Sequence, residues 1–430
     1  MQDSPCYDEA RKNYNAYFNK FPLIIVYCKS ERDVVNAILW VRRHRLPFRI
    51  RGGGHSYEAY SLVNGGLVID VSCLLRLQID PENRTAQVGA GHRLLPLYET
   101  LWNHGMAIPG GTCPTVGVSG LTLGGGYGLL SRLLGMTCDS LLEVEMVTAR
   151  GRIIRANDRQ HSDLLWACRG GGGGSFGVVT SFTFRVHPIG NVSRYRITWD
   201  FADLEKVVGY WQTWAPFADP RLTSLLALPA QNQGDLRANG VFVGSEEELR
   251  QLLEPLQEAV PPKTAEFQSI SWIEAVCFFA GTPLRQDKFK NSSAYGYEPL
   301  SHEALSVLIR NLQTAPGPSN VLSLDAYGGQ IRRVPESATA FPHRKSLFVM
   351  HYQSYWQQDA DAEKNIKWIE GFRRSMLPYT RGAYCNYCDS AIRDWPRAYF
   401  ESNLPRLIRV KQKYDPENLF SFEQSIPPRF

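Results

Sequence analysis

The sequence contains no run of 18 apolar residues, the length that a membrane-spanning helix requires. Residues 1–18 also lack the apolar core of a secretory signal peptide. There is no strong charge bias, because a net charge of only +5 is spread over 430 residues. We therefore expect a soluble protein, cytoplasmic or of unidentified compartment, with no membrane partner and no nucleic-acid partner.

Cysteine is not arranged as a disulfide framework, because the nine cysteines are odd in number and scattered. Cys385 and Cys388 form a C-x-x-C pair, which can be half of a zinc site or a redox pair. Since no second pair with suitable spacing exists, we expect no metal and an incidental role for both cysteines.

The chain is long enough for two domains around one ligand. Up to about residue 190, short apolar strands alternate with amphipathic helices, and glycine clusters lie between them. Beyond Pro188 the glycine clusters stop, and longer helices alternate with aromatic-rich strands. This pattern predicts an α+β protein whose second domain is an antiparallel sheet backed by helices. We predict domains at 1–190 and 191–380, and a segment, 381–430, that is helical from Ala398 to Tyr414.

Two glycine-rich blocks, at 51–54 and 117–128, could each place backbone N–H groups around a pyrophosphate, although tight turns between strands would have the same composition. A third cluster spells G-x-G-x-x-G at Gly172, Gly174 and Gly177. It follows a helix and precedes a strand, the reverse of the dinucleotide-binding fingerprint, so it does not indicate nicotinamide binding.

Each of the first two glycine blocks is next to a reactive side chain: His55 follows Gly54, and Cys113 precedes Gly117. Alone, His55 could be a turn histidine and Cys113 an inert buried thiol. The repetition of the arrangement favours a dinucleotide cofactor held by both loops.

Several longer stretches, in the same order along the chain, resemble one family. They are RGGGHSYEAYS (51–61), PGGTCPTVGVSGLTLGGGYGLLSRLLGMTCDSL (109–141), SDLLWACRGGGGGSFGVVTSFTFRV (162–186), TAFPHR (339–344), YCNYCD (384–389) and YDPENLFSFEQSIPP (414–428). The chain resembles the berberine-bridge-enzyme-like flavoproteins, a branch of the vanillyl-alcohol-oxidase-type enzymes with a PCMH-type FAD-binding domain.

The resemblance implies FAD attached twice, through His55 to the 8α carbon and through Cys113 to C6. It also implies an FAD domain made from the first 190 residues and the C-terminal segment, with the second domain binding substrate. The positions that match the family's cofactor-binding residues are Arg51, Gly52, Gly53, Gly54, Ser56, Gly117, Val118, Gly120, Gly124, Gly177, Val179 and Asn386.

Catalytic positions also follow from the resemblance. Tyr387 matches a tyrosine that takes the proton of the substrate hydroxyl while hydride moves from carbon to flavin N5, and Tyr384 is expected to line the pocket. Tyr127 matches the tyrosine of the family's G-G-G-Y-G motif, and Tyr57 matches the one after the flavin histidine. From the sequence alone, two tyrosines three residues apart are usually packing residues. A phenol with a pKa near 10 also needs a nearby cation or hydrogen bonds to act as a base, and His351, Lys345 and Arg344 are candidates.

The electron acceptor is implied by Val116, three residues after the flavin cysteine, where valine accompanies oxidase behaviour in plant relatives. Otherwise Val116 is simply an apolar loop residue. We expect an oxidase that reduces O2 to hydrogen peroxide and oxidises an alcohol or the anomeric hydroxyl of a sugar.

The alternatives are an oxidative cyclase or dehydrogenase of secondary metabolism, or a flavoprotein scaffold or coat component without activity. A metal-binding module built on the C-x-x-C pair is a further rival. Aromatic residues of the middle region suit sugar, phenolic and alkaloid substrates equally.

Overall fold

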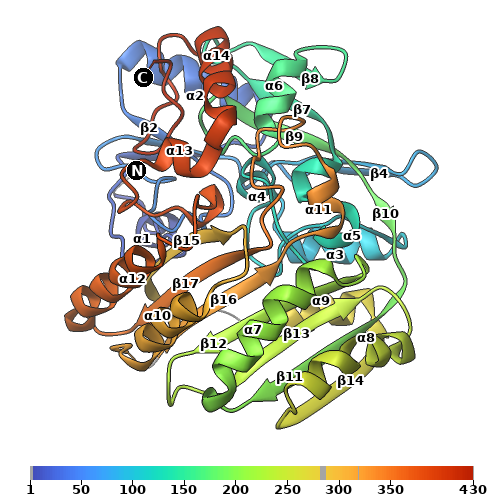
Figure 1. Cartoon of the computed structure of the whole chain (residues 1–430). Coiled ribbons are helices and arrows are strands. Elements are labelled where there is room, and N and C mark those ends of the chain that lie inside the picture. The colour runs from blue at the N-terminus through green and yellow to red at the C-terminus, as the bar shows by residue number, and fades with distance from the viewer. Residues whose placement is uncertain (1–2, 281–286, 318, 430) are drawn as a thin grey trace.

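The computed structural model describes residues 3–280, 287–317 and 319–429. In these ranges the strands form four sheets. Three of them use residues 24–188, and the seven-stranded sheet uses residues 191–356. Figure 1 shows the smaller sheets in the upper part of the molecule and the large sheet below them.

A small parallel sheet, with strand order β1-β3-β2, begins the upper part. Its strands and first helices are α1 (Tyr7–Ala10), β1 (Ile24–Tyr27), α2 (Glu31–His44), β2 (Phe48–Arg51) and β3 (Leu67–Asp70). Ser30 caps α2 by accepting from the backbone of Asp33, whose carboxylate accepts in return from Ser30. The end of β2 delivers the chain directly into the first glycine loop.

A five-stranded antiparallel sheet of order β4-β5-β9-β7-β8 follows, with a short β10–β6 pair beside it. The strands are β4 (Leu77–Asp80), β5 (Thr85–Gly89), β6 (Met106–Ala107), β7 (Leu141–Val147), β8 (Ile153–Asn157), β9 (Val178–Arg185) and β10 (His187–Pro188). The helices are α3 (Leu94–Trp102), α4 (Val118–Leu123), α5 (Ser131–Leu134) and α6 (Ser162–Cys168).

The large sheet is antiparallel, with order β14-β11-β13-β12-β16-β17-β15. Its strands are β11 (Asn191–Trp199), β12 (Leu222–Pro229), β13 (Leu236–Phe242), β14 (Thr264–Ser271), β15 (Lys288–Gly296), β16 (Ser319–Ala326) and β17 (Phe348–Trp356). The helices of this part are α7 (Leu204–Trp214), α8 (Glu246–Ala259), α9 (Trp272–Ala280), α10 (His302–Gln313), α11 (Gly329–Arg333) and α12 (Ala362–Met376).

The two faces of the large sheet differ in burial, and period-two alternation along its strands explains why. On one face, side chains such as Trp199, Leu226 and Tyr352 form a closed core with α7, α8, α10 and α12. Those helices lie in front of the strands in Figure 1. The opposite face carries mostly polar and partly exposed side chains and is turned toward the upper part of the molecule.

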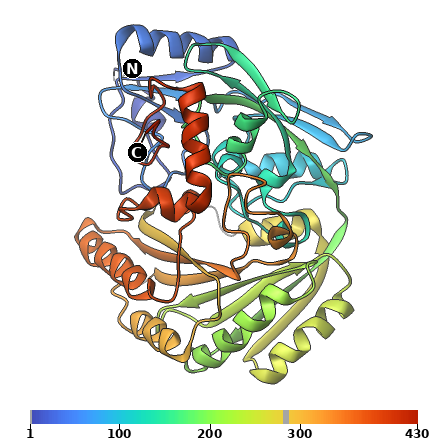
Figure 2. The same cartoon turned by 45° about the horizontal axis from the view of Figure 1, so that its top comes forward.

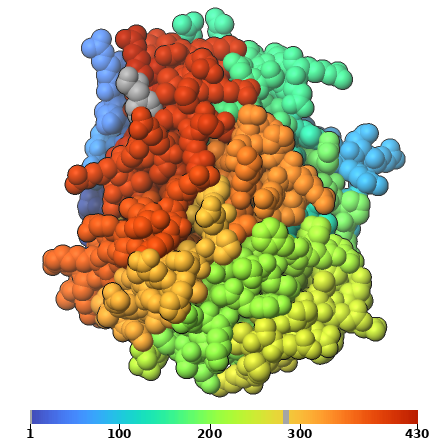
Figure 3. Space-filling model, in the orientation of Figure 1, coloured from blue at the N-terminus to red at the C-terminus, as the bar shows by residue number. Residues whose placement is uncertain are grey.

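The C-terminal segment returns to the upper part, where its apolar residues join the core of residues 28–192. Figure 2 shows α14 (Leu404–Tyr414) packed against that part, and in Figure 3 the deepest red atoms lie at the top of the molecule. The prediction of one helix from Ala398 to Tyr414 is wrong. Helix α13 (Trp395–Phe400) ends, and a 3-10 turn follows at Glu401–Asn403. The second residue of α14 is Pro405, whose ring would clash with the carbonyl of Glu401 in a continuous helix.

The predicted α+β class, with an antiparallel sheet backed by helices, is confirmed. The division into domains stays a prediction, although sheet membership changes between Pro188 and Asn191. None of the helices in the described ranges has both the length and the apolar character needed to cross a bilayer.

Candidate functional site

A cavity lies between the upper part of the molecule and the C-terminal segment. Five segments supply most of its wall: the loop after β2, the turn leading into α4, the loop between α6 and β9, the 3-10 turn Cys385–Tyr387 and residues 420–424. The predicted site residues that line it are Gly52, Gly53, Gly54, His55, Ser56, Tyr57, Cys113, Val116, Gly117, Gly120, Gly177, Val179, Asn386 and Tyr387.

The first two glycine loops touch each other, backbone against backbone. A Cβ on Gly53 would overlap the backbone nitrogen of Gly117, and a Cβ on Gly117 would lie 2.5 Å from the backbone nitrogen of Gly53. Gly54 has φ +72° and Gly174, in the third loop, has φ +78°, a region that favours glycine. Glycine is therefore required here both for close packing and for backbone conformation.

His55 and Cys113 converge on a single residue, Thr115. The His55 Nε2 lies 3.0 Å from Thr115 Oγ1, and the Cys113 Sγ lies 3.8 Å from the same atom. The imidazole also stacks on Tyr14, with ring centroids 3.9 Å apart. Burial, assisted by the charge of Arg93, lowers the pKa of His55 to about 4, so the ring is neutral at pH 7 and one nitrogen keeps its lone pair.

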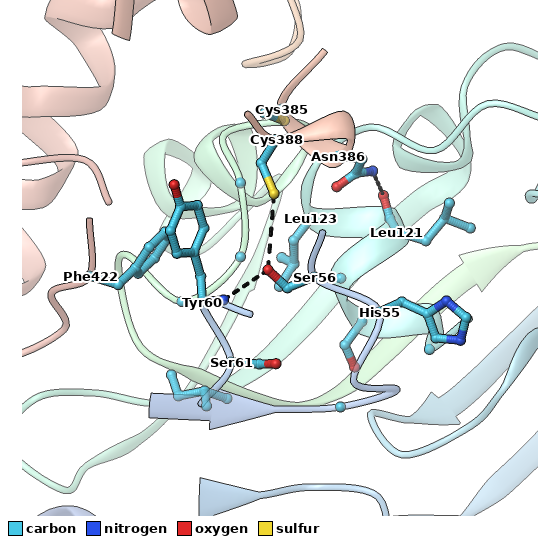
Figure 4. A pocket seen from close by; sticks show the side chains of 18 of the residues that line it. His55, Ser56, Tyr60, Ser61, Leu121, Leu123, Cys385, Asn386, Cys388 and Phe422 are labelled. Carbon is cyan, nitrogen blue, oxygen red and sulfur yellow. Dashed lines mark hydrogen bonds between the residues drawn. The ribbon is translucent and has the colours of Figure 1, made fainter. Parts of the chain in front are cut away.

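Two polar atoms without protein partners belong to side chains that line this cavity. Ser61 Oγ and Arg49 Nε are buried and have no hydrogen-bond partner among the described residues. The hydroxyl of Ser56, in contrast, accepts from the backbone of Tyr60 at 3.0 Å and lies 4.0 Å from Cys388 Sγ (Figure 4). Unpartnered buried polar groups are costly, so the wall is suited to a ligand that itself offers hydrogen-bonding groups.

Tyr387 stands at the junction of the cavity and the large sheet. Its ring stacks on that of His351, 3.9 Å between centroids, and is parallel to that of Tyr57 at 5.8 Å. The Tyr57 hydroxyl in turn lies 3.4 Å from His351 Nε2. Burial, followed by the nearby charge of Asp325, raises the pKa of Tyr387 well above its ordinary value.

None of the three candidate cations supplies a charge to Tyr387. Burial lowers the pKa of His351 to about 3, so this ring is neutral. Arg344 is fully buried in a two-point ion pair with Asp139, both contacts at 2.7 Å. Lys345 is exposed and lies 3.6 Å from Glu336. None of these three candidates therefore lowers the pKa of Tyr387.

Asp325 is a site residue that sequence reasoning missed. It sits on β16 opposite Val349 of β17, and so shares a sheet face with His351, two residues further along. Burial alone raises the pKa of its carboxyl to about 7. A single Asp in an apolar strand is weak evidence of a functional residue. Only the pairing register of β16 with β17 brings Asp325 close to Tyr387.

Tyr384 and Asn386 fix the 3-10 turn to the second glycine block. The Tyr384 hydroxyl accepts from the backbone N–H of Gly126 at 2.8 Å and from the side chain of Asn386 at 3.0 Å. Asn386 also donates to the Leu121 carbonyl at 3.0 Å (Figure 4), and a Cβ on Gly124 would overlap its side-chain oxygen. Tyr384 and Gly124 thus support the wall from behind and do not line it.

Three other predicted residues also lie behind the wall. Arg51 is buried and ion-paired with Asp70 at 2.5 Å. Val118 is fully buried in the core. Tyr127 donates to the Ala326 carbonyl at 2.9 Å and stacks on Tyr327.

A buried charge cluster anchors both tyrosine-bearing segments to β15. Lys290 forms ion pairs with Glu58, next to Tyr57, and with Asp389 at 2.7 Å. Although burial opposes it, the two carboxylates hold the pKa of Lys290 above its usual value. The cluster therefore positions the loop after β2 and the turn Cys385–Tyr387 against the sheet.

Comparison with known families decides the identity of the fold and cofactor. Residues 22–157 match a family described as "FAD binding domain", and residues 383–427 match "Berberine and berberine like". A Bacillus subtilis (strain 168) protein named as an uncharacterized FAD-linked oxidoreductase, YgaK, is 44% identical over 99% of this chain and 96% of its own length. The chain belongs to the berberine-bridge-enzyme-like family. It is an FAD-linked oxidoreductase.

Solved structures of berberine-bridge-enzyme-like proteins superpose on the whole chain. Wild-type BBE-like 1 of Physcomitrella patens gives a TM-score of 0.93 at 33% identity, covering 100% of this chain and 96% of that one. Monolignol oxidoreductase AtBBE-like 13 of Arabidopsis thaliana is 31% identical over 95% of this chain and 84% of its own length. The predicted family is confirmed.

The residues present fit FAD. Three glycine loops supply the close backbone approach that a pyrophosphate needs, and Ser61 and Arg49 offer polar atoms that lack protein partners. Across the described part of the chain, no group of three or more His, Cys, Asp or Glu residues is placed to hold a metal ion.

Proposed function

We propose that this berberine-bridge-enzyme-like protein is an oxidase whose FAD is attached through both His55 and Cys113. Its substrate is an alcohol or a sugar oxidised at the anomeric hydroxyl, and O2 is reduced to hydrogen peroxide. The observation that carries this proposal is the convergence of His55 and Cys113 on Thr115 within one cavity wall.

The protonation state of His55 favours its attachment. Because its pKa is lowered to about 4, the imidazole is neutral at pH 7 and can act as a nucleophile. Thr115 fixes the ring orientation through Nε2, and Tyr14 holds the ring plane. FAD, when bound, supplies the hydride acceptor and the subsequent reaction with oxygen.

Tyr387 is the proposed acceptor of the substrate hydroxyl proton. A buried phenol whose pKa lies well above 10 can accept a proton only if it releases its own. Asp325 is a carboxylate on the facing sheet and is ionised above about pH 7, so it is suited to receive that proton. The neutral ring of His351 packs against Tyr387 and holds the phenol in position.

Val116 supports oxygen as the acceptor. It lines the cavity between Cys113 and Gly117 and is a small branched side chain. In the relative Phl p 4, one isoleucine-to-valine substitution separates a variant titled a glucose dehydrogenase from one titled a glucose oxidase. In this fold, then, a single branched residue can accompany the change of acceptor. A dehydrogenase with another acceptor is the alternative.

Relatives support a hydroxyl-bearing small molecule as the substrate. One structural relative is titled chitooligosaccharide oxidase, with TM-score 0.92 and 26% identity, and Phl p 4 is titled as having glucose dehydrogenase activity. Another is a monolignol oxidoreductase, and a berberine bridge enzyme variant is titled a reticuline dehydrogenase. The alternative functions are an oxidative cyclase of secondary metabolism and a flavoprotein scaffold without catalytic turnover.

The test of attachment uses acid-denatured, washed protein on a gel, with flavin fluorescence and absorbance measured on the protein band. We expect flavin to stay on wild-type protein and on each single variant, His55→Ala and Cys113→Ala, and to be released from the double variant. Cys385→Ala is the matched control, because Cys385 lines the same cavity. Flavin that is released from wild-type protein, or retained by the double variant, would contradict the proposal.

A further inference from the structure

A third apolar cluster reaches from the cavity to the surface, and tyrosine is its commonest residue. Four of its buried members are tyrosines and two more tyrosines pack against it: Tyr127, Tyr295, Tyr327, Tyr384, Tyr297 and Tyr387. Tyr387 lines the cavity, whereas Tyr297, which follows β15, is partly exposed. Phenol rings therefore connect the cavity with the surface.

The rings of this cluster follow one another in contact. Tyr387 and Tyr384 have ring centroids 4.9 Å apart. Phe341 bridges the next step, because its ring lies 6.1 Å from that of Tyr384 and 6.5 Å from that of Tyr327. The Tyr327 ring then lies 5.6 Å from that of Tyr295. All four separations fall within the roughly 4.5–7 Å of a direct aromatic contact.

The surface end of this chain of rings carries a proton acceptor. The Tyr295 ring stacks on His343, with centroids 4.1 Å apart, and Nδ1 of His343 lies 3.0 Å from the Tyr297 hydroxyl. In the tautomer protonated at Nε2, which has no partner among the described residues, His343 accepts from Tyr297. Glu401 lies 3.6 Å from Nδ1 and 3.4 Å from the same hydroxyl. An imidazolium formed at His343 would therefore be stabilised by a neighbouring carboxylate.

Packing alone does not explain the phenols in the middle of the chain of rings. Tyr295 and Tyr327 are fully buried, and the only hydrogen bond of either hydroxyl in the described part of the chain is the 3.5 Å contact between them. That distance is long for a bond between two hydroxyls. Phenylalanine would fill the same space without desolvating a hydroxyl. Because a phenol loses one electron far more readily than a phenyl ring does, electron transfer gives these side chains a role that packing does not.

The place where an electron vacancy would settle is set by the bases around the phenols. Burial raises the pKa of Tyr295, Tyr327 and Tyr384 well above the ordinary value, so all three keep their protons. A phenol that has lost an electron is strongly acidic, and it is stabilised where a base can take its proton. Of the six tyrosines, only Tyr297 has an imidazole nitrogen within hydrogen-bonding distance in the described ranges.

We propose that these tyrosines form a one-electron path from the flavin cavity to Tyr297 at the surface. The oxidant is oxidised FAD that has absorbed blue light, and Tyr387 gives it one electron. Each next tyrosine replaces that electron in turn, until Tyr297 has lost one electron and its proton has moved to Nδ1 of His343. A soluble one-electron donor, such as ascorbate, then reduces Tyr297, and the proton returns to the phenol oxygen. The net reaction moves one electron from the donor to the flavin and leaves the protein unchanged.

The test uses the FAD-loaded protein and does not depend on substrate turnover. Oxidised holoenzyme is illuminated with blue light in the absence of substrate, and neutral tyrosyl radical is followed by transient absorption and, after freezing, by electron paramagnetic resonance. The variants are Tyr297→Phe and His343→Gln. The control is Tyr210→Phe, which changes a partly exposed tyrosine of α7 in the helix-covered core of the large sheet. Flavin absorbance and melting temperature verify the FAD content and folding of each variant.

We expect wild type to form a long-lived tyrosyl radical, because an electron vacancy at Tyr297 is separated from the flavin cavity by the buried rings. Tyr297→Phe should lose this long-lived signal but keep the initial electron transfer from Tyr387. His343→Gln should shorten the lifetime of the radical, since its proton then has no imidazole to move to. Tyr210→Phe should behave as wild type, and ascorbate should remove the wild-type signal.

The absence of a long-lived tyrosyl radical in wild type, or an equal yield of it in Tyr297→Phe, would overturn the inference. An unchanged lifetime in His343→Gln would overturn the assignment of His343 as proton acceptor. If His343→Gln does not fold, Tyr297→Phe alone decides the case, because it retains the ring. The proposed function fails separately: if the radical forms as expected but no alcohol or sugar reduces the flavin, the path stands and only the proposed oxidase activity is refuted.

Discussion

Asp325 is the titratable group whose replacement should change both stability and activity. Its carboxyl is 9% exposed, and burial raises its pKa from 3.8 to about 7. At 1.36 kcal/mol per pKa unit, the ionised folded state carries a penalty of about 4 kcal/mol. Asn has nearly the same shape and no charge, so Asp325→Asn should remove that penalty.

The sign of the pH dependence follows from proton binding. Below about pH 4 the carboxyl is protonated in both folded and unfolded chains, so it imposes no penalty on the stability of the folded state. Between about pH 4 and 7 only the folded chain holds the proton, so wild-type stability falls as pH rises. Above about pH 7 the full penalty applies, and the advantage of Asp325→Asn is greatest.

The assay compares melting temperatures of variant and wild type from pH 4.5 to 8.5. With an unfolding entropy of roughly 2.1 cal/mol/K per residue over 430 residues, 4 kcal/mol corresponds to about 4 °C if the whole chain unfolds together. The variant should therefore gain about 4 °C relative to wild type between pH 4.5 and pH 8.5. Asp394→Asn, at an exposed carboxyl, is the control and should show no such trend.

The same variant tests the proposed proton path. Anaerobic flavin reduction by wild type should rise with pH through about 7, and Asp325→Asn should be slow at every pH without that ionisation. A melting-temperature difference that does not vary with pH would refute the electrostatic reasoning. An unchanged reductive pH profile would refute the catalytic one.

Three further outcomes are expected. Val116→Ile should slow flavin reoxidation by O2, measured by stopped flow in air-saturated buffer. The rate of anaerobic flavin reduction should stay within about twofold of wild type. A variant that is slower only in flavin reduction would contradict the role of Val116. Gly124→Ala should displace Asn386 and destabilise the protein by roughly 1–3 kcal/mol, because the new Cβ overlaps the Asn386 side chain. Gly120→Ala is the control and should lower the melting temperature much less, because nothing lies within 4 Å of a Cβ at that position. Lys290→Met should lower the free energy of unfolding by roughly 3–5 kcal/mol, because it leaves two buried carboxylates without a cation. The melting temperature should fall at pH 8 and recover partly at acidic pH, where the carboxylates are protonated. No loss of stability at pH 8 would show that the cluster is not an anchor.

The features that sequence patterns predicted are those with local causes. The strands and helices expected up to about residue 190, and the aromatic-rich strands beyond Pro188, each depend on a few neighbouring residues. Glycine loops next to His55 and Cys113 were equally visible, because dense glycine beside a reactive side chain is rare. The break before α14 also has a local cause, Pro405, but the predicted helix from Ala398 to Tyr414 ran through it.

What the sequence did not predict depends on register between distant strands. Asp325 faces Tyr387 only because β16 pairs with β17 in one register, and a slip by one residue would turn it into the helix-covered core. Conversely, Tyr384, Tyr127 and Arg51 match the family motifs, but their hydroxyls or guanidinium are used to support the wall.

The cavity wall has a consequence for the time at which the protein can acquire its cofactor. Its first loop is complete by residue 61, but its last wall segment is residues 420–424. At translation rates of 5–20 residues per second, roughly 20–70 s separate the synthesis of these two pieces. During that interval the glycine loops are on the ribosome without the segments that close over them. We therefore expect the complete wall to form, and flavin to be captured, only after residues 420–424 have been synthesised.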